Sequence, residues 1–156
     1  MLIVQKHECG FDGLTGRLGN AAVPTPDLIH RIITDACTRL PTLKKSGKTT
    51  VLDQLIEAGA WCDVALALIE IELPAWSVRR LVREDGEWFC SLTRQPNLPV
   101  ALDDTADASH VALPLAILGA FLEARRKIAA VSNSATSVVP QVRPVSGNAI
   151  CCDNFA

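Results

Sequence analysis

Tyrosine is absent from this sequence of 156 residues, and all aromatic residues together make up only 4% of it. An aromatic-rich core is therefore excluded, and alanine, leucine, valine and isoleucine must fill most of the interior. Hydrophobic residues make up 49% of the chain, which is enough for a real core and excludes an intrinsically disordered protein. The length fits one ordinary domain.

The sequence also lacks an excess of positive or of negative charge. The 15 basic and 17 acidic residues give a formal net charge of −2, whereas a nucleic-acid-binding domain is typically strongly basic or carries one concentrated basic patch. The longest apolar run, Val111–Leu122, contains a proline and a glycine and is too short to span a bilayer. Because the first residues also lack the pattern of a signal peptide, we expect a cytoplasmic protein without a membrane partner.

The six cysteines include no C-x-x-C pair. In a protein that is not exported, a disulfide framework is not the default. Cys37, Cys62 and Cys90 lie within apolar patterns, so we expect them to be small buried hydrophobic residues.

Both ends of the chain lack apolar periodicity. Residues 1–24 hold four regularly spaced glycines, and residues 131–156 are rich in serine, asparagine and proline. We therefore expect a poorly ordered N-terminal segment (1–24) and a poorly ordered C-terminal tail (131–156). Between them the sequence predicts a single domain over residues 25–130.

Three helices are predicted in the first half of this domain. A threonine, a proline and an aspartate at 25–27 are typical of a helix start, apolar residues recur at helical spacing as far as Leu40, and Pro41 is expected to end the helix. A second helix is expected to begin near Thr49 or Thr50, and a third to cover Asp63–Glu72. One face of the third helix is expected to carry Cys62, Ala65, Leu66, Ile69 and Leu73.

A β-hairpin is predicted around Asp85-Gly86, because this pair readily adopts the positive φ angles of a two-residue turn. The turn would pair Val82 with Phe89, Leu81 with Cys90 and Arg83 with Trp88. Glu84 would then face Glu87, a like-charge pair that argues against perfect register. Apolar residues fall on both faces, with Trp76, Val78, Val82 and Phe89 on one and Leu81, Trp88, Cys90 and Leu92 on the other. Such a sheet needs cover on both sides.

The last helix is predicted to begin either with the acids at 103–107 or at Pro114, and to end at the cations 125–127. Leu98–Leu102 is a candidate third strand. The order of elements predicts an α+β fold, namely a small layered α-β-β-α domain with an N-terminal helical extension, in which a β-hairpin, with or without a third strand, is covered by helices. The broad apolar surface of the last helix leaves homodimerisation open.

Three stretches resemble the small phage-type α-β-β-α sandwich domains and related uncharacterised proteins of alphaproteobacteria. They are a helix ending in Leu73-Pro74-Ala75-Trp76, a hairpin containing Trp88, and a helix start at Leu113-Pro114-Leu115-Ala116-Ile117. The resemblance covers roughly residues 63–124, and the long N-terminal region and tails depart from it. It implies the fold and a prophage or accessory-genome type of protein, and it carries over no catalytic residue.

Residues Lys44–Leu55, KKSGKTTVLDQL, resemble the end of a phosphate-binding loop. Such a loop needs a glycine at the position of Thr42 and a strand before it, and the sequence has neither. We favour a lysine-rich turn before a helix over a nucleotide site at Lys48.

Two groups of acidic, histidine and cysteine residues are of the types that ligate metals. Asp103, Asp107 and His110 would share one face of a continuous helix and could support a metal-dependent hydrolase, although acids also favour the first turn of any helix. His7-Glu8-Cys9 and Cys151-Cys152 carry zinc-binding residue types but lie in opposite tails. We expect neither a metal nor another cofactor.

Arg79, Arg80, Arg83 and Trp88 are the candidate partner-binding residues, with Arg94 and Trp76 nearby in the predicted hairpin. Arginine beside aromatic rings suits phosphate and base contacts, and it equally suits an acidic protein. The alternative is that the arginines cover the sheet and pair with the acids of the turn. We therefore expect a non-catalytic interaction module whose partner is an unknown protein or a nucleic acid.

Overall fold

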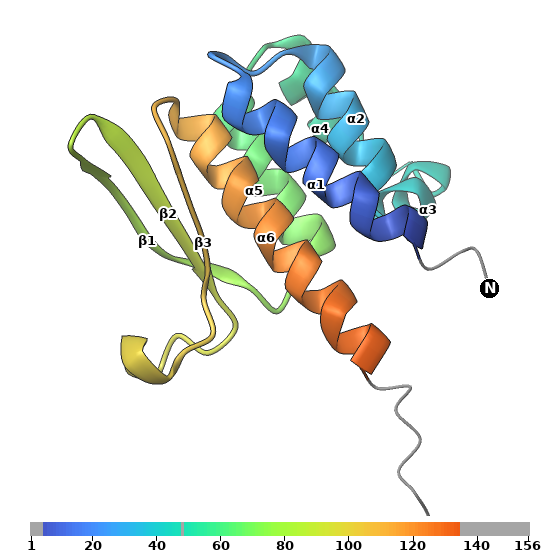
Figure 1. The fold of residues 1–156 in the computed structure, drawn as a ribbon. Coiled ribbons are helices and arrows are strands. Elements are labelled where there is room, and N and C mark those ends of the chain that lie inside the picture. Colours follow the sequence, from blue (N-terminus) through green and yellow to red (C-terminus); the bar gives the residue numbers. More distant parts are fainter. Residues whose placement is uncertain (1–4, 48, 135–156) are drawn as a thin grey trace, which may run out of the picture.

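Six helices, one short 3₁₀ helix and a three-stranded antiparallel sheet make up the part of the chain that the computed structural model describes, residues 5–47 and 49–134 (Figure 1). The helices are α1 (Gln5–Asn20), α2 (Pro26–Ala36), α3 (Leu40–Lys45), α4 (Thr50–Glu57), α5 (Trp61–Glu72) and α6 (Leu113–Ser134). The strands are β1 (Ser77–Glu84), β2 (Glu87–Thr93) and β3 (Ala106–His110), in the spatial order β1-β2-β3, and the 3₁₀ helix η1 covers Val100–Leu102. The predicted α+β class is confirmed.

Helix α6 is the centre of the packing. It contacts β2 and β3 of the sheet as well as α1 and α5. Figure 1 shows the helices gathered on one side of the sheet, so the described helices do not provide the expected cover on both faces. Gly119 permits the close approach, because a Cβ atom added there would lie 2.8 Å from the Cβ of Ala108 on β3. Among the described residues, no helix is both long and apolar enough to cross a membrane.

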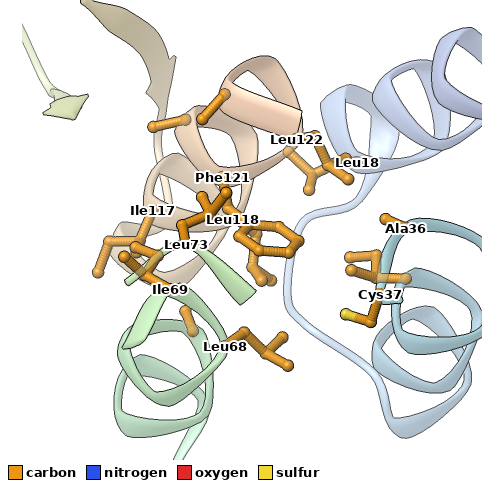
Figure 2. Packing of buried hydrophobic residues seen from close by; sticks show 14 of the residues in the cluster. Leu18, Ala36, Cys37, Leu68, Ile69, Leu73, Ile117, Leu118, Phe121 and Leu122 are labelled. Atoms are coloured by element: carbon orange, nitrogen blue, oxygen red, sulfur yellow. The ribbon is translucent and has the colours of Figure 1, made fainter. Parts of the chain in front are cut away.

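The core is aliphatic, as the composition predicted. Figure 2 shows side chains of α1, α5 and α6 meeting those of Ala36 and Cys37 around Phe121, which is fully buried. The buried residues of α6 are Leu115, Ala116, Ile117, Leu118, Ala120, Phe121, Leu122 and Ala124. The apolar surface that left homodimerisation open is therefore largely used inside the fold.

The predicted face of α5 is only partly right. Ala65, Ile69 and Leu73 are buried, but so are Val64 and Leu68. By contrast, the other two predicted residues, Cys62 and Leu66, are respectively half-buried and 37% exposed. A helix that is apolar nearly all round does not reveal from its pattern which side faces the core.

Helix α2 starts as predicted, with Thr25 Oγ1 accepting a hydrogen bond from the Leu28 N–H at 3.3 Å and Pro26 in the first turn. It ends at Ala36, however, and α3 begins at Leu40. Pro41 lies in the first turn of α3, where the missing N–H has no helical partner to lose. The proline therefore starts a helix here and does not end one.

The N-terminal segment was expected to have little order, and this is wrong for residues 5–20, which form α1. Phe11, Leu14 and Leu18 are buried at helical spacing against the core, so tertiary packing outweighs the low helix propensity of four glycines. At the other end, α6 was expected to end at the cations 125–127, and it instead continues to Ser134, which also lies past the expected domain limit at 130. Residues 135–156 lie outside the described part.

The hairpin has the predicted two-residue turn, with positive φ at both Asp85 (51°) and Gly86 (89°). Every predicted cross-strand pair is present, including Glu84 opposite Glu87. A bulge between Val78 and Arg80 places Val78 opposite Leu92, which moves it to the other face from the one predicted. The third strand is β3, whereas the candidate strand at 98–102 instead contains η1.

Candidate interaction surface

Strand β1 forms an exposed edge of the sheet. It pairs with β2 alone among the described strands, and none of its eight residues is buried. By contrast, the last four residues of β2 are buried. Helix α6 packs on β2 and β3, so Val78 and Leu81 of β1 remain 38% and 37% exposed. The hairpin thus offers both a free backbone edge and partly exposed apolar side chains.

Arg80 lies on the face of the hairpin that carries Val82 and Phe89. Its guanidinium carbon is 5.7 Å from the centre of the Phe89 ring, and its Nη2 is 2.5 Å from Glu84 Oε1. Both charged side chains are more than half exposed. An ion pair this exposed contributes little to folding, so both groups are available to a partner.

Arg83 lies on the opposite face, because it pairs directly with Trp88 and paired residues share a face. Its guanidinium carbon is 6.0 Å from the Trp88 ring. Trp88 is half-buried against the core, and its neighbour on β3 is His110. Arg80 and Arg83 therefore do not form one patch, and the turn between the strands carries three acids, Glu84, Asp85 and Glu87.

Arg79 has a structural role. Its Nη1 is 2.6 Å from Asp103 Oδ2, its Nη2 donates to the Leu98 carbonyl at 2.7 Å, and Thr93 Oγ1 donates to the same Asp103 oxygen at 2.5 Å. The side chains of Arg79 and Asp103 are only 17% and 3% exposed. Arg79 thus fastens the segment after β2 against the hairpin and is not available for a partner.

Arg94 also contacts an aromatic ring, since its guanidinium carbon lies 5.4 Å from the centre of the Trp76 ring. Trp76 is 7% exposed and packs in the core, and its indole Nε1 has no hydrogen-bond partner. This tryptophan is a packing residue, so it does not add to an exposed stacking surface.

The structure does not bring Asp103, Asp107 and His110 together. Asp103 follows η1 and is held by Arg79, whereas Asp107 and His110 belong to β3. Two residues three apart on a strand point to opposite faces, and His110 Nδ1 instead accepts a hydrogen bond from the Ala112 N–H at 2.9 Å. The helical spacing behind the metal hypothesis is absent, and no group of three or more His, Cys, Asp or Glu residues in the described ranges could hold a metal ion.

The described thiols are poor nucleophiles. Burial raises the pKa of Cys37 to about 12 and that of Cys90 to about 11, and it also raises the pKa of half-buried Cys62. A protonated thiol neither attacks nor ligates readily. Lys48, the candidate nucleotide-site residue, lies outside the described part, and so do the side chains of the candidate zinc ligands His7, Glu8, Cys9, Cys151 and Cys152.

An open groove of about 750 Å³ between α1 and α2 was not predicted, because the N-terminal segment was expected to lack structure. Its lining includes Arg17, Asp27, Arg31 and Asp35, so charges of both signs are mixed along it. Nothing in this arrangement selects one sign of ligand charge.

Glu72 is the other feature that the sequence did not reveal. Its side chain is fully buried, and its carboxylate accepts hydrogen bonds from the backbone N–H groups of Thr38 (3.0 Å), Arg39 (2.9 Å) and Leu40 (2.6 Å). The Nη1 of Arg125 lies 4.0 Å away. Glu72 therefore caps the start of α3 from another helix, a structural role that long-range packing alone creates.

Comparison with known proteins finds no matching family model, no matching curated protein and no matching solved structure.

Proposed function

We propose that this protein is an interaction module that binds an extended segment of a protein partner along the free edge of β1. The observation that carries the proposal is the unburied state of the whole strand beside a well-buried β2. An exposed edge offers a row of unpaired N–H and C=O groups, and a strand added there gains main-chain hydrogen bonds while neighbouring side chains supply specificity.

The side chains around the edge support a protein partner better than a nucleic acid. Arg80 and Arg83 lie on opposite faces, Arg79 is held internally, and the turn is acidic. A nucleic-acid surface would need its positive charges concentrated on one side. The partly exposed Val78 and Leu81 instead suit the alternating side chains of an added strand. The prophage or accessory-genome type remains a prediction from the sequence resemblance.

The backbone of Arg83 gives a direct test. In a two-residue turn the Glu84 carbonyl bonds the Glu87 N–H, and bonded and non-bonded pairs alternate along an antiparallel ladder. Val82 and Phe89 therefore form a bonded pair, and the N–H groups of Leu81 and Arg83 point away from β2. Arg83→Pro should remove an outward donor without removing a ladder bond, whereas Arg83→Ala removes only the side chain.

The experiment selects peptides from a random library on the immobilised wild-type protein and measures their affinity for both variants by fluorescence anisotropy. We expect about a tenfold or greater loss for Arg83→Pro and a smaller change for Arg83→Ala, since each affinity decade corresponds to about 1.4 kcal/mol. Circular dichroism verifies that both variants are folded. Equal binding to Arg83→Pro would refute the edge as the docking surface, and salt-sensitive binding of labelled DNA or RNA that Arg80→Ala weakens would favour the nucleic-acid alternative.

A further inference from the structure

We infer that the segment that pairs with the β1 edge is β1 of a second copy of this chain, with a two-fold axis at Val82. This inference rests on the proposed function and names its partner. In this arrangement two antiparallel β1 strands join two three-stranded sheets into one continuous sheet.

The backbone of β1 fits such a two-fold pairing. The outward groups belong to Leu81 and Arg83, as the alternation of the hairpin ladder requires. An axis at Val82 places Leu81 of one copy opposite Arg83 of the other, so the outward donors and acceptors meet in about four main-chain hydrogen bonds. Val82 then faces its own copy as the central non-bonded pair.

The charges of β1 fit the same register. Arg80, Val82 and Glu84 alternate along one face of the strand. With the axis at Val82, Arg80 of each copy lies opposite Glu84 of the other, so two ion pairs flank the central valines. A shift of one residue would bring the outward groups of one copy against residues whose groups point to β2. A shift of two residues would place Val82 opposite Arg80 or opposite Glu84, and it would lose both ion pairs. The edge is self-complementary in this one register.

The opposite face has a matching apolar contact. Leu81 is 37% exposed in the single chain, and Arg83 lies near the ring of half-buried Trp88. The proposed register brings Leu81 against the aliphatic stem of Arg83 from the second copy, which covers part of its exposed surface. The other edge strand, β3, carries Asp107 but no arginine or lysine, so it offers no such self-match.

The bulge at Arg79 limits the regular ladder to residues 80–84 of each copy, so the contact is short. Short interfaces form weak dimers, and we expect a dissociation constant of about 1–100 µM. Analytical ultracentrifugation of the wild-type protein over a concentration series measures it. Arg80→Glu and Glu84→Arg each replace two attractive pairs with two repulsive ones and should weaken self-association about tenfold or more.

The decisive measurement mixes the two single variants. In the Arg80→Glu chain both positions of the pair are acidic, and in the Glu84→Arg chain both are basic, so both cross-strand pairs become attractive again in the mixed dimer. We expect the mixture to form a heterodimer within about threefold of the wild-type affinity, read by fluorescence anisotropy of one labelled variant. The ion pair within one chain cannot produce this rescue, because each variant has lost it. The exposure of both side chains means that both variants should fold, which circular dichroism verifies.

Three results would overturn the inference: a wild-type protein that stays monomeric at about 1 mM, single variants that dimerise as well as the wild type, or a mixture without rescue. If the wild type is monomeric but still binds selected peptides in a way that Arg83→Pro abolishes, the second copy fails as the partner and the β1 docking edge stands. If peptide binding is also insensitive to Arg83→Pro, both fail.

Discussion

Replacement of Glu72 by glutamine is the most informative test of how the fold is held together. The carboxylate is fully buried, accepts hydrogen bonds from three consecutive backbone N–H groups of residues 38–40, and lies 4.0 Å from Arg125. Glutamine has nearly the same shape, so no cavity forms. It keeps one acceptor oxygen but turns the other into an NH₂ donor that faces N–H donors, and it removes the negative charge beside Arg125.

The magnitude follows from these contacts. Hydrogen bonds to a charged group are each worth about 1.5–3 kcal/mol, and breaking a buried pair by removing one partner costs about 3–5 kcal/mol. Because glutamine retains one acceptor, we expect Glu72→Gln to lower the free energy of unfolding by about 3 kcal/mol. For a chain of this length that corresponds to a fall in Tm of about 6–12 °C.

Urea unfolding followed by circular dichroism measures the change, with an unaltered m value showing that the unfolded state is the same. Glu70→Gln is the matched control, because Glu70 is an exposed glutamate on the same helix and should change stability by less than about 0.5 kcal/mol. If Glu72→Gln proves as mild as Glu70→Gln, the carboxylate of Glu72 does not hold the α2–α3 junction, and its hydrogen bonds to residues 38–40 do not stabilise the fold.

Two further predictions concern packing and pH. Gly13→Ala in α1 should raise the free energy of unfolding by about 0.5–1 kcal/mol, since the added Cβ would meet nothing within 4 Å apart from its chain neighbours and the backbone of its own helix. Gly119→Ala should lower the free energy of unfolding, because its Cβ would lie 2.8 Å from the Cβ of Ala108. Urea unfolding that ranks the two variants the other way would contradict this. Burial raises the pKa of Cys37 from 9.0 to about 12, so the folded state holds this proton more tightly and stability should fall as pH rises from 9.0 towards 12. Cys37→Ala should make that fall shallower by up to about 1.4 kcal/mol per pH unit in unfolding curves taken across this range, and an unchanged slope would disagree.

Local signals in the sequence predicted those parts of the fold that local physics decides. The start of α2 needs only a capping threonine and a proline, and the hairpin needs only Asp85-Gly86, so both are where the pattern put them. Glu84 opposite Glu87 argued against the register, yet the pair is present. At the exposed end of a hairpin, water screens the two charges, and the turn geometry outweighs their repulsion.

Long-range packing decided the parts that the sequence did not predict. The glycines of α1 argue against a helix, but Phe11, Leu14 and Leu18 bury against the core once α6 is in place. In the sequence, Glu72 resembles any exposed acid at a helix end. Its buried role depends on the start of α3, which is distant in the sequence and packs beside it only in the fold. The alternation of apolar and polar residues along β1 does not indicate the bulge at Arg79. This bulge places Val78 on the opposite face from the one predicted.

The sequence predicted which residues belong to the candidate surface, but it did not predict how they are arranged. The packing of α6 explains this difference. Alternation along β1 shows two faces, but it cannot show which edge of the sheet stays open. That is decided by α6, whose close approach at Gly119 and Ala108 sets it over β2 and β3 and leaves β1 beyond the helical layer. Charged residues on such an edge hinder indiscriminate pairing. The arginines of β1 therefore have two consequences: they oppose most strands that could add to the edge, while Arg80 and Glu84 together admit a strand of matching charge in one register.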